Sequence, residues 1–407
     1  MLTVKSIGAN VKQLKQYGMV AAGSLGLTGG RALTGPVQAQ IGISDPCNHE
    51  CVFCWDHPPK ERETSATADR FGHRRPGVMA LEQFKGIVDD LYDLGTRRID
   101  LVGRGEPLLN RSAPEMIRYV KKRDMHLVLC TNASRLFEPV AELLVAVGVD
   151  RVNVSLNAGT PETYPLNHVT ETPADYLKVK KNLRFLADCK IAAGSKSPVI
   201  TLSFVISSKN FFEIAEMVEV AHEVGAQEVQ FNHSVIHEGS ADLALSDAQY
   251  RELQSRLPVV RARASSLGLH SNLETFSASM PPYMQTETAG PSVVPCYVGW
   301  YFTVILGNGS VMPCCQCSNP VGQVTRERRL AEVWASADYE QFRIAARSLP
   351  EPSDRLASCE CGNCQLRPRN LAIHNLLHPM NKVQAGEEVK FYSKGLLGRL
   401  QGKRVIT

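Results

Sequence analysis

The chain has 407 residues, of which 43% are hydrophobic and 21% are charged, so it can bury a substantial core. Its 45 Lys and Arg residues against 41 Asp and Glu residues leave a net charge of +4, and no long block of one sign indicates a nucleic-acid groove. No run of about 18 uninterrupted apolar residues occurs, which argues against a transmembrane helix and a membrane partner. Glycine and serine interrupt the mildly apolar stretch 19–27, so we expect no secretory leader and a cytoplasmic location.

Twelve cysteines are distributed unevenly along the chain. Three lie between residues 47 and 54 and seven between residues 296 and 364, which leaves Cys130 and Cys189 isolated. A disulfide framework is typical of short secreted domains, whereas clustered cysteines in a long chain without a leader indicate metal or redox chemistry. We expect the two isolated cysteines to be buried structural thiols.

Short β-rich runs alternate with amphipathic helical patterns from residue 37 onward, as is typical of a parallel sheet covered by helices. The six expected strands are 37–43, 98–102, 126–130, 151–156, 199–206 and 228–231. The six expected helices lie near 81–95, 114–123, 137–147, 174–190, 211–224 and 247–267. Six such units form either an open doubly wound sheet or an incomplete barrel, and in both folds ligands bind at the carboxyl ends of the strands.

Unusual polar motifs follow these expected strands, where ligands would bind. In strand order they are the cysteine loop, Gly103–Pro107, Thr131–Asn132, Asn157, Ser207–Ser208 and Asn232–Ser234. Because the carboxyl ends of parallel strands meet at one edge of a sheet, these motifs are expected to converge on an active site.

The rest of the chain has a different character. Residues 271–295 are rich in Ser, Thr, Pro and Met and predict a linker or a loop over the active site. Residues 300–306 and 310–312 flank Asn308-Gly309, which predicts a hairpin, and a helical pattern follows over 330–347. The expected organisation is an N-terminal helical extension 1–36, a core 37–270, the linker 271–295, a second domain 296–375 and a basic tail 376–407.

The first cysteine cluster, Cys47-x3-Cys51-x2-Cys54, places three thiols in one loop. Such a loop can hold three corners of a 4Fe-4S cluster and leave the fourth iron open, whereas electron-transfer clusters normally have all four sites filled. A zinc site completed by His49 and His57 is the alternative, but zinc leaves the glycine-acid motif after the second strand unexplained.

This spacing, the aromatic Phe53 before the third cysteine and the Gly105-Glu106-Pro107 stretch together resemble the radical S-adenosylmethionine (radical SAM) superfamily, over roughly residues 37–240. The resemblance implies an α/β fold: a partial (βα)6 TIM-like barrel with a small C-terminal α+β auxiliary-cluster domain. It also implies that S-adenosylmethionine chelates the open iron of a 4Fe-4S cluster. The reduced cluster then cleaves the cofactor to methionine and a 5′-deoxyadenosyl radical, with a flavodoxin- or ferredoxin-type protein as reductant.

Several cofactor contacts follow from the resemblance. The Gly105-Glu106-Pro107 stretch would hold the methionyl amine through its acid and its backbone, although Arg104 replaces a glycine of the family motif. Phe53 would stack on adenine, with a packing role as the alternative.

The fourth strand resembles the ribose-binding strand of the family. Its alternating polar residues, Asn153, Ser155 and Asn157, are expected to share the inner face of the barrel, where they need hydrogen-bonding partners. Ribose hydroxyls would serve, and bonds to one another or to water are the alternative. Ser203 and His233 are weaker pocket candidates.

The second cysteine cluster offers two pairs of thiols, Cys296-x17-Cys314 and Cys361-x2-Cys364, which together complete one cluster. The pattern resembles the auxiliary-cluster extensions called twitch and SPASM domains, in which a hairpin glycine, here Gly309, precedes a cysteine by five positions. A zinc knuckle is the non-redox alternative.

The one-cluster twitch form is favoured, because no isolated cysteine follows Cys364. Cys315, Cys317 and Cys359 are left unassigned: they could replace the chosen ligands or help to hold a second auxiliary cluster.

We therefore expect a radical SAM oxidoreductase that abstracts hydrogen from a small alcohol or sugar-like substrate, with one auxiliary 4Fe-4S cluster aiding oxidation or binding. Peptide modification, by epimerisation or cross-linking, is the alternative, but about 36 residues before the first strand are few for a leader-binding domain. A non-catalytic iron-sulfur carrier or zinc module is the alternative of another class. The catalytic base stays open among Asp56, His57, Arg104, His233 and residues of the 271–295 linker.

Overall fold

The structure is a computed structural model that describes residues 4–54, 56–59, 77–236, 239–278, 294–351, 353–359, 361, 364 and 366–383. A ten-stranded sheet runs through this described part, in the order β10-β9-β8-β1-β2-β3-β4-β5-β6-β7. The core strands are β1 (Gln38–Ile41), β2 (Arg98–Leu101), β3 (His126–Thr131), β4 (Arg151–Ser155), β5 (Val199–Ile206), β6 (Glu228–His233) and β7 (His270–Ser271). Each pairs in parallel with its neighbour, which confirms the expected succession of strands.

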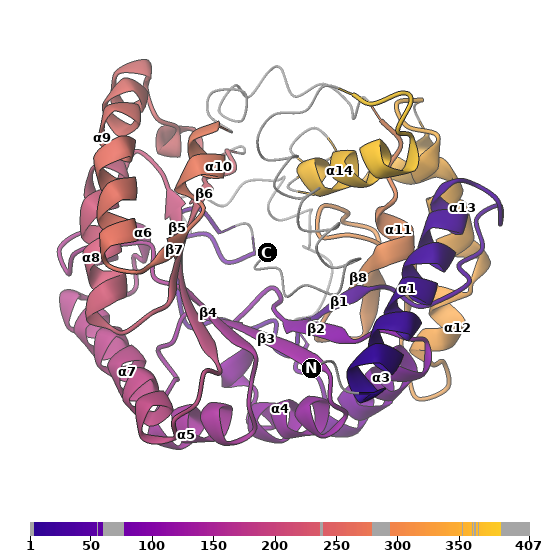
Figure 1. Ribbon diagram of the computed structural model, residues 1–407, viewed down its shortest axis with the longest axis horizontal. Coiled ribbons are helices and arrows are strands. Elements are labelled where there is room, and N and C mark those ends of the chain that lie inside the picture. Colours follow the sequence, from indigo (N-terminus) through magenta and orange to yellow (C-terminus); the bar gives the residue numbers. More distant parts are fainter. Residues whose placement is uncertain are drawn as a thin grey trace.

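The helices between these strands form an outer ring around the curved sheet (Figure 1). They are α3 (Leu81–Asp93), α4 (Ala113–Lys122), α5 (Glu138–Ala146), α6 (Tyr164–Asn167), α7 (Pro173–Ala192), α8 (Ile214–Glu223) and α9 (Asp247–Ser266). The two longest begin at capping boxes formed by Thr172 and Ser246, whose side chains satisfy backbone N–H groups that have no partner within the helix.

Alternate residues of each strand point in opposite directions, and this alternation separates an apolar outer face from a polar inner face. The outer set, including Ile41, Leu129 and Phe204, is fully buried against the helices. The inner set includes Asp100, Asn153, Ser203 and Asn232, whose polar groups bond one another across the strands or face the lumen. The result is the expected α/β partial barrel with a polar interior.

The C-terminal hairpin extends the core sheet at its β1 edge. Strand β8 (Phe302–Ile305) pairs in parallel with β1, and β9 (Ser310–Met312) and β10 (Gly322–Gln323) follow antiparallel. The predicted turn is confirmed: Gly309 has a φ of +84°, a conformation that glycine adopts without strain.

The helical pattern over 330–347 is two helices, α12 (Leu330–Trp334) and α13 (Ala337–Arg347). The helix is interrupted between them because the Ser336 side chain accepts a hydrogen bond from Tyr339 N and caps the start of a new helix. Arg343 on α13 is fully buried, donates to the carbonyls of Gly299 and Trp334, and stacks between aromatic rings.

Four further helices complete the described chain: α1 (Val4–Ser24), α10 (Leu273–Ala278), α11 (Val298–Tyr301) and α14 (Arg367–Leu377). Helix α1 lies within the stretch 1–36 that we expected to be a helical extension, and it contacts α11. Helix α14, which the sequence did not predict, lies on the inner side of the curved sheet (Figure 1). The basic residues of the tail beyond 383 and most of the linker, 279–293, lie outside the described residues.

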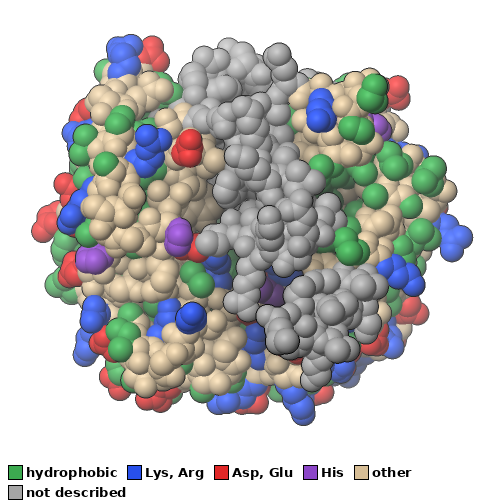
Figure 2. Space-filling view, in the orientation of Figure 1, with side chains coloured by type: hydrophobic (Ala, Val, Ile, Leu, Met, Phe, Trp, Pro, Cys, Tyr) green, Lys and Arg blue, Asp and Glu red, His purple; other side chains and the backbone are tan. Residues whose placement is uncertain are grey.

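On the face shown in Figure 2, basic and acidic side chains are interspersed around the periphery. No helix among the described residues is both long enough and apolar enough to cross a membrane.

Candidate active site

The first cysteine cluster lies in the loop after β1, at the carboxyl edge of the sheet. Cys47, Cys51 and Cys54 are all free thiols and partly exposed. Burial raises the pKa of each, to about 12 for Cys54, and the proximity of the other two thiols raises the pKa of Cys51 further. Three adjacent thiols on one short loop match the donor set that a cluster with one open iron needs, so these residues fit that group.

His168, which the sequence analysis missed, contacts this loop. Its Nδ1 lies 3.1 Å from Cys51 Sγ and its Nε2 lies 3.2 Å from the Leu156 carbonyl oxygen, and Cys51 and His168 form an isolated β-bridge. Burial lowers the pKa of His168 to about 3 and that of His49 to about 4. Nothing in the local sequence marks His168, because only the fold brings it across from the segment after α6.

His49, Cys51 and His168 place one ligand atom each within 4.8 Å of one another, which is the geometric basis for the zinc alternative. That arrangement uses His168 where the sequence suggested His57. The ring of His57 instead contacts the Asp45 carbonyl oxygen, with 2.7 Å between Nε2 and that oxygen. A zinc site here would include only one thiol of the three and leaves Cys47 and Cys54 without a role.

The Gly-Glu-Pro loop after β2 touches the start of the cysteine loop. A Cβ at Gly105 would lie 2.1 Å from the Pro46 carbonyl oxygen, so only glycine permits this approach, and Glu106 N donates to the same oxygen at 3.1 Å. Arg104 donates to Asp56 at 2.9 Å and ties the two loops together a second time. The arginine that departs from the family motif therefore has a structural partner in the cysteine loop.

The Glu106 carboxylate is almost fully buried. Its oxygens accept hydrogen bonds from Leu108 N at 3.0 Å, Thr131 Oγ1 at 2.7 Å and Asn132 N at 2.8 Å. Burial raises its pKa, and these hydrogen bonds oppose that rise. The side chain thus joins the ends of β2 and β3, and Pro107 follows it as the first residue of a short 3-10 helix, Pro107–Leu109.

The polar residues of β4 do not all share one face. Asn153 and Ser155 belong to the inner set, and Asn153 Oδ1 has no partner among the described residues. Asn157 lies beyond the strand at a φ of +58°, and its buried Oδ1 accepts from Val205 N at 2.8 Å. The expected common face is therefore wrong for Asn157, because the left-handed turn after β4 breaks the two-residue alternation.

The remaining candidates, Phe53, Ser203 and His233, lie in three different places. Phe53 is partly buried in the cysteine loop, with its ring 6.1 Å from that of His168. Ser203 Oγ accepts from Asn232 Nδ2 at 2.9 Å on the inner face. His233 stacks on Phe276 with 4.2 Å between ring centroids, which ties β6 to α10.

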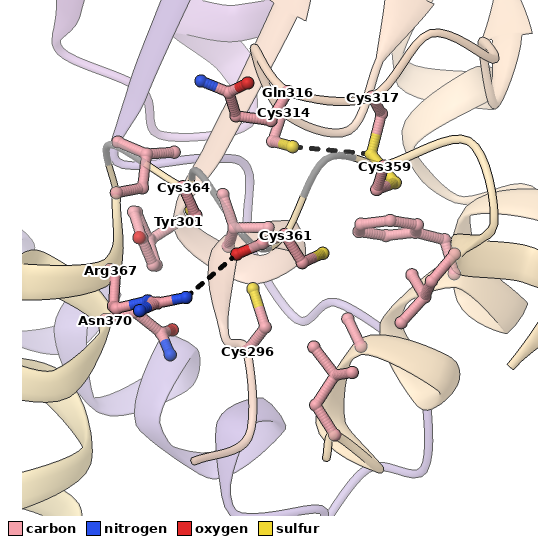
Figure 3. A pocket seen from close by; sticks show the side chains of 16 residues that line it. Cys296, Tyr301, Cys314, Gln316, Cys317, Cys359, Cys361, Cys364, Arg367 and Asn370 are labelled. Atoms are coloured by element: carbon pink, nitrogen blue, oxygen red, sulfur yellow. Dashed lines mark hydrogen bonds between the residues drawn. A yellow bond between two sulfur atoms is a disulfide. The ribbon is translucent and has the colours of Figure 1, made fainter. Parts of the chain in front are cut away.

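The second cysteine cluster surrounds a cavity in the C-terminal part (Figure 3). Cys296, Cys314, Cys361 and Cys364 all line it as free thiols, and the sulfurs of Cys296 and Cys361 point into the same space. Burial raises the pKa of all four thiols. Four thiols around one cavity fit a fully ligated cluster.

Two of the unassigned cysteines, Cys317 and Cys359, form a disulfide at the edge of this cavity. Cys314 Sγ lies 3.5 Å from Cys317 Sγ. Cys315 is partly buried, forms no disulfide and does not line the cavity.

The isolated cysteines are not fully buried, contrary to expectation. Cys130 lies on the inner face of β3, with its Sγ 3.9 Å from Asn153 Nδ2, and burial raises its pKa to about 12. Cys189 is partly exposed on α7.

Two family models match the chain: the Radical SAM superfamily over residues 41–221 and SPASM, an iron-sulfur cluster-binding domain, over residues 296–365. The tungsten-containing aldehyde ferredoxin oxidoreductase cofactor-modifying protein of Pyrococcus furiosus is 22% identical over 347 residues, which cover 80% of this chain and 86% of that protein. PqqA peptide cyclase of Gluconobacter oxydans is 23% identical over 345 residues, covering 82% and 84%.

The fold is also similar to that of Streptococcus suis SuiB bound to S-adenosylmethionine. The TM-score is 0.57 at 17% identity, and the similarity covers 81% of this chain and 72% of SuiB. The two matching models imply a 4Fe-4S cluster with S-adenosylmethionine in the barrel and auxiliary iron-sulfur binding in the C-terminal part. The chain is thus an enzyme of the radical SAM superfamily that carries a C-terminal SPASM-type iron-sulfur domain.

Proposed function

We propose that this enzyme reductively cleaves S-adenosylmethionine and abstracts hydrogen from a small polar substrate held in the barrel. The observation that carries the proposal is the contact between two loops at the carboxyl edge of the sheet. One loop bears Cys47, Cys51 and Cys54, and Gly105 of the other lies flush against its start. When bound, the cluster supplies the electron that cleaves the sulfonium bond.

The residues around the site have separate roles in this proposal. The three cysteines would hold the cluster, and the backbone around Gly105 would face the methionyl part of the cofactor. Glu106 holds that backbone in place through its three hydrogen bonds. Asn153 and Ser155 would meet the ribose, since Asn153 Oδ1 lacks a partner among the described residues. Phe53 would stay close to the adenine.

The C-terminal cysteines would hold one auxiliary 4Fe-4S cluster. Cys296, Cys314, Cys361 and Cys364 provide the four thiolates, and the Cys317–Cys359 disulfide leaves too few free thiols nearby for another. This site would accept an electron from the substrate or help to bind it. The net reaction would then be oxidation of an alcohol or sugar-like carbon.

A small substrate is favoured because the inner face offers hydroxyl and amide groups, at Asn153, Ser155, Ser203 and Asn232, that suit hydrogen bonding to a compact polar molecule. The relative from Pyrococcus furiosus is named for modifying a cofactor, which is consistent with this choice. Peptide modification is the second candidate, and the similarity to PqqA peptide cyclase favours it.

The test is anaerobic reconstitution of the iron-sulfur clusters, followed by reduction with S-adenosylmethionine and assay of 5′-deoxyadenosine. The variant Cys47→Ala/Cys51→Ala/Cys54→Ala should form none, whereas Cys189→Ala, on the outer helix α7, should behave as the wild type. If the loaded and reducible wild type forms no deoxyadenosine, the electron-carrier alternative replaces this proposal.

A further inference from the structure

The base of the barrel lumen, near the amino ends of the strands, carries two ion pairs. On β2, Arg98 Nε lies 2.9 Å from Asp100 Oδ1, and Gln38 of β1 donates to Asp100 Oδ2 at 2.5 Å. Farther along the sheet, Arg151 of β4 pairs with Glu228 of β6, with 3.0 Å between Nη2 and Oε1. Each of these pairs is electrically neutral.

A fifth charge reaches this base from the iron-sulfur domain. Arg369 projects from α14, and its Nη1 donates to Gln38 Oε1 at 2.9 Å. Its guanidinium stacks over the ring of Tyr301 with 4.6 Å to the centroid, which fixes the plane of the fork. Tyr301 is almost fully buried, and its hydroxyl has no partner among the described residues.

Arg369 has no carboxylate partner in the described part of the chain. The carboxylates already present at the lumen base, Asp100 and Glu228, are engaged with Arg98 and Arg151. The side chain is partly buried, where an uncompensated charge is costly unless a ligand pairs with it. A guanidinium with free N–H groups pairs bidentately with planar or tetrahedral oxyanions.

We infer that Arg369 binds an anionic group of the substrate, a carboxylate or a phosphate, at the base of the lumen. Tyr301, beneath it, lines the cavity of the second cysteine cluster, so an anion held here would place the substrate between that cluster and the carboxyl edge of the barrel. This inference rests on the proposed function, because it names the substrate class of the same lumen.

The test measures anion binding to the cluster-loaded full-length enzyme. Inorganic phosphate and citrate are the probes, titrated calorimetrically at an ionic strength held constant with sodium chloride. Arg369→Gln should weaken binding about 10- to 100-fold, which is the loss of affinity expected when a charge-assisted pair of hydrogen bonds is removed. Arg369→Lys should be intermediate, because it keeps the charge but loses the fork. The matched control is Arg261→Gln, an exposed arginine on α9.

Equal affinity in the wild type and Arg369→Gln, or no binding of either probe by the wild type, overturns the inference. Unchanged iron content in Arg369→Gln shows that the variant folds and keeps its clusters. Deoxyadenosine formation without substrate should persist in Arg369→Gln. Its absence from the wild type would contradict the proposed function, whereas its presence without Arg369-dependent anion binding would contradict this inference alone.

Discussion

Gly105 is the residue at which the cofactor loop and the cysteine loop come closest. Any side chain at this position would meet the carbonyl oxygens of Pro46 and Asp45, both within 2.3 Å of an added Cβ. Backbone oxygens cannot rotate away as a flexible side chain can. The two loops can pack this closely only because residue 105 has no Cβ atom.

Gly105→Ala should separate these loops and lower deoxyadenosine formation about 100-fold, because small misplacements of reacting groups cost that much. Gly86→Ala is the control, since a Cβ at Gly86 of α3 would meet nothing within 4 Å. Deoxyadenosine assays and circular dichroism on both variants check this. Wild-type activity in Gly105→Ala would show that the loops can shift without loss.

The raised pKa of the Cys54 thiol, about 12, predicts its reactivity in the folded, cluster-free protein. Below that value the thiol is mostly protonated, so its thiolate fraction should rise about tenfold for each pH unit. We expect alkylation by iodoacetamide at pH 8 to be much slower in the folded protein than in urea. Mass spectrometry of the modified peptide measures this, and equal rates would show that burial does not protect the thiol.

At the scale of single elements, α14 connects the second cysteine cluster to the barrel, because Arg369 on this helix also bonds Gln38 of β1. Asn370 on this helix is buried, donates to the Pro295 carbonyl at 2.6 Å and accepts from Tyr297 N at 2.7 Å. These two bonds hold the segment that contains Cys296. The position of that thiol therefore depends on how α14 docks.

Asn370→Leu should destabilise the protein by about 2 kcal/mol, because it leaves a buried N–H and a buried carbonyl without partners. It should also lower iron retention in the C-terminal part. Asn375→Leu is the control, since Asn375 on the same helix bonds only Val383 among the described residues. Thermal unfolding and iron analysis would detect the difference, and identical behaviour of the two variants would rule out this role.

At the scale of the whole molecule, both cysteine sites are attached to one sheet, because β8 pairs directly with β1. The cysteine loop follows β1 and the second cluster begins just before β8. The two proposed metal sites are therefore attached to neighbouring strands of one rigid sheet. Their separation is fixed by strand pairing and not by a flexible linker.

Iron analysis of reconstituted protein should find about eight iron atoms per chain, from two 4Fe-4S clusters. Cys296→Ser should lose about half of them, whereas Cys317→Ser/Cys359→Ser should keep them all, because the disulfide removes these residues from the ligand set. If the double variant loses as much iron as Cys296→Ser, Cys317 or Cys359 is a ligand after all.

Much of the barrel could be predicted from local signals. The strands were found because alternating or continuous apolar runs, such as 199–206, recur between amphipathic helices. The hairpin at Gly309 was found because Asn-Gly has a strong turn preference. Asn157 was wrongly predicted to share the inner face, because the strand alternation was extended beyond Ser155, where the strand ends and the backbone turns.

The sequence by itself indicated iron-sulfur chemistry at the two cysteine clusters and the succession of the core strands along the chain, because spacing and periodicity are local properties of the chain. Only the tertiary structure decided that His168 contacts Cys51, that Cys317 joins Cys359, and that Arg369 reaches the base of the lumen. These contacts join residues 42 to 331 positions apart, and their partners are chosen by packing of the whole sheet. No local sequence pattern predicts these contacts.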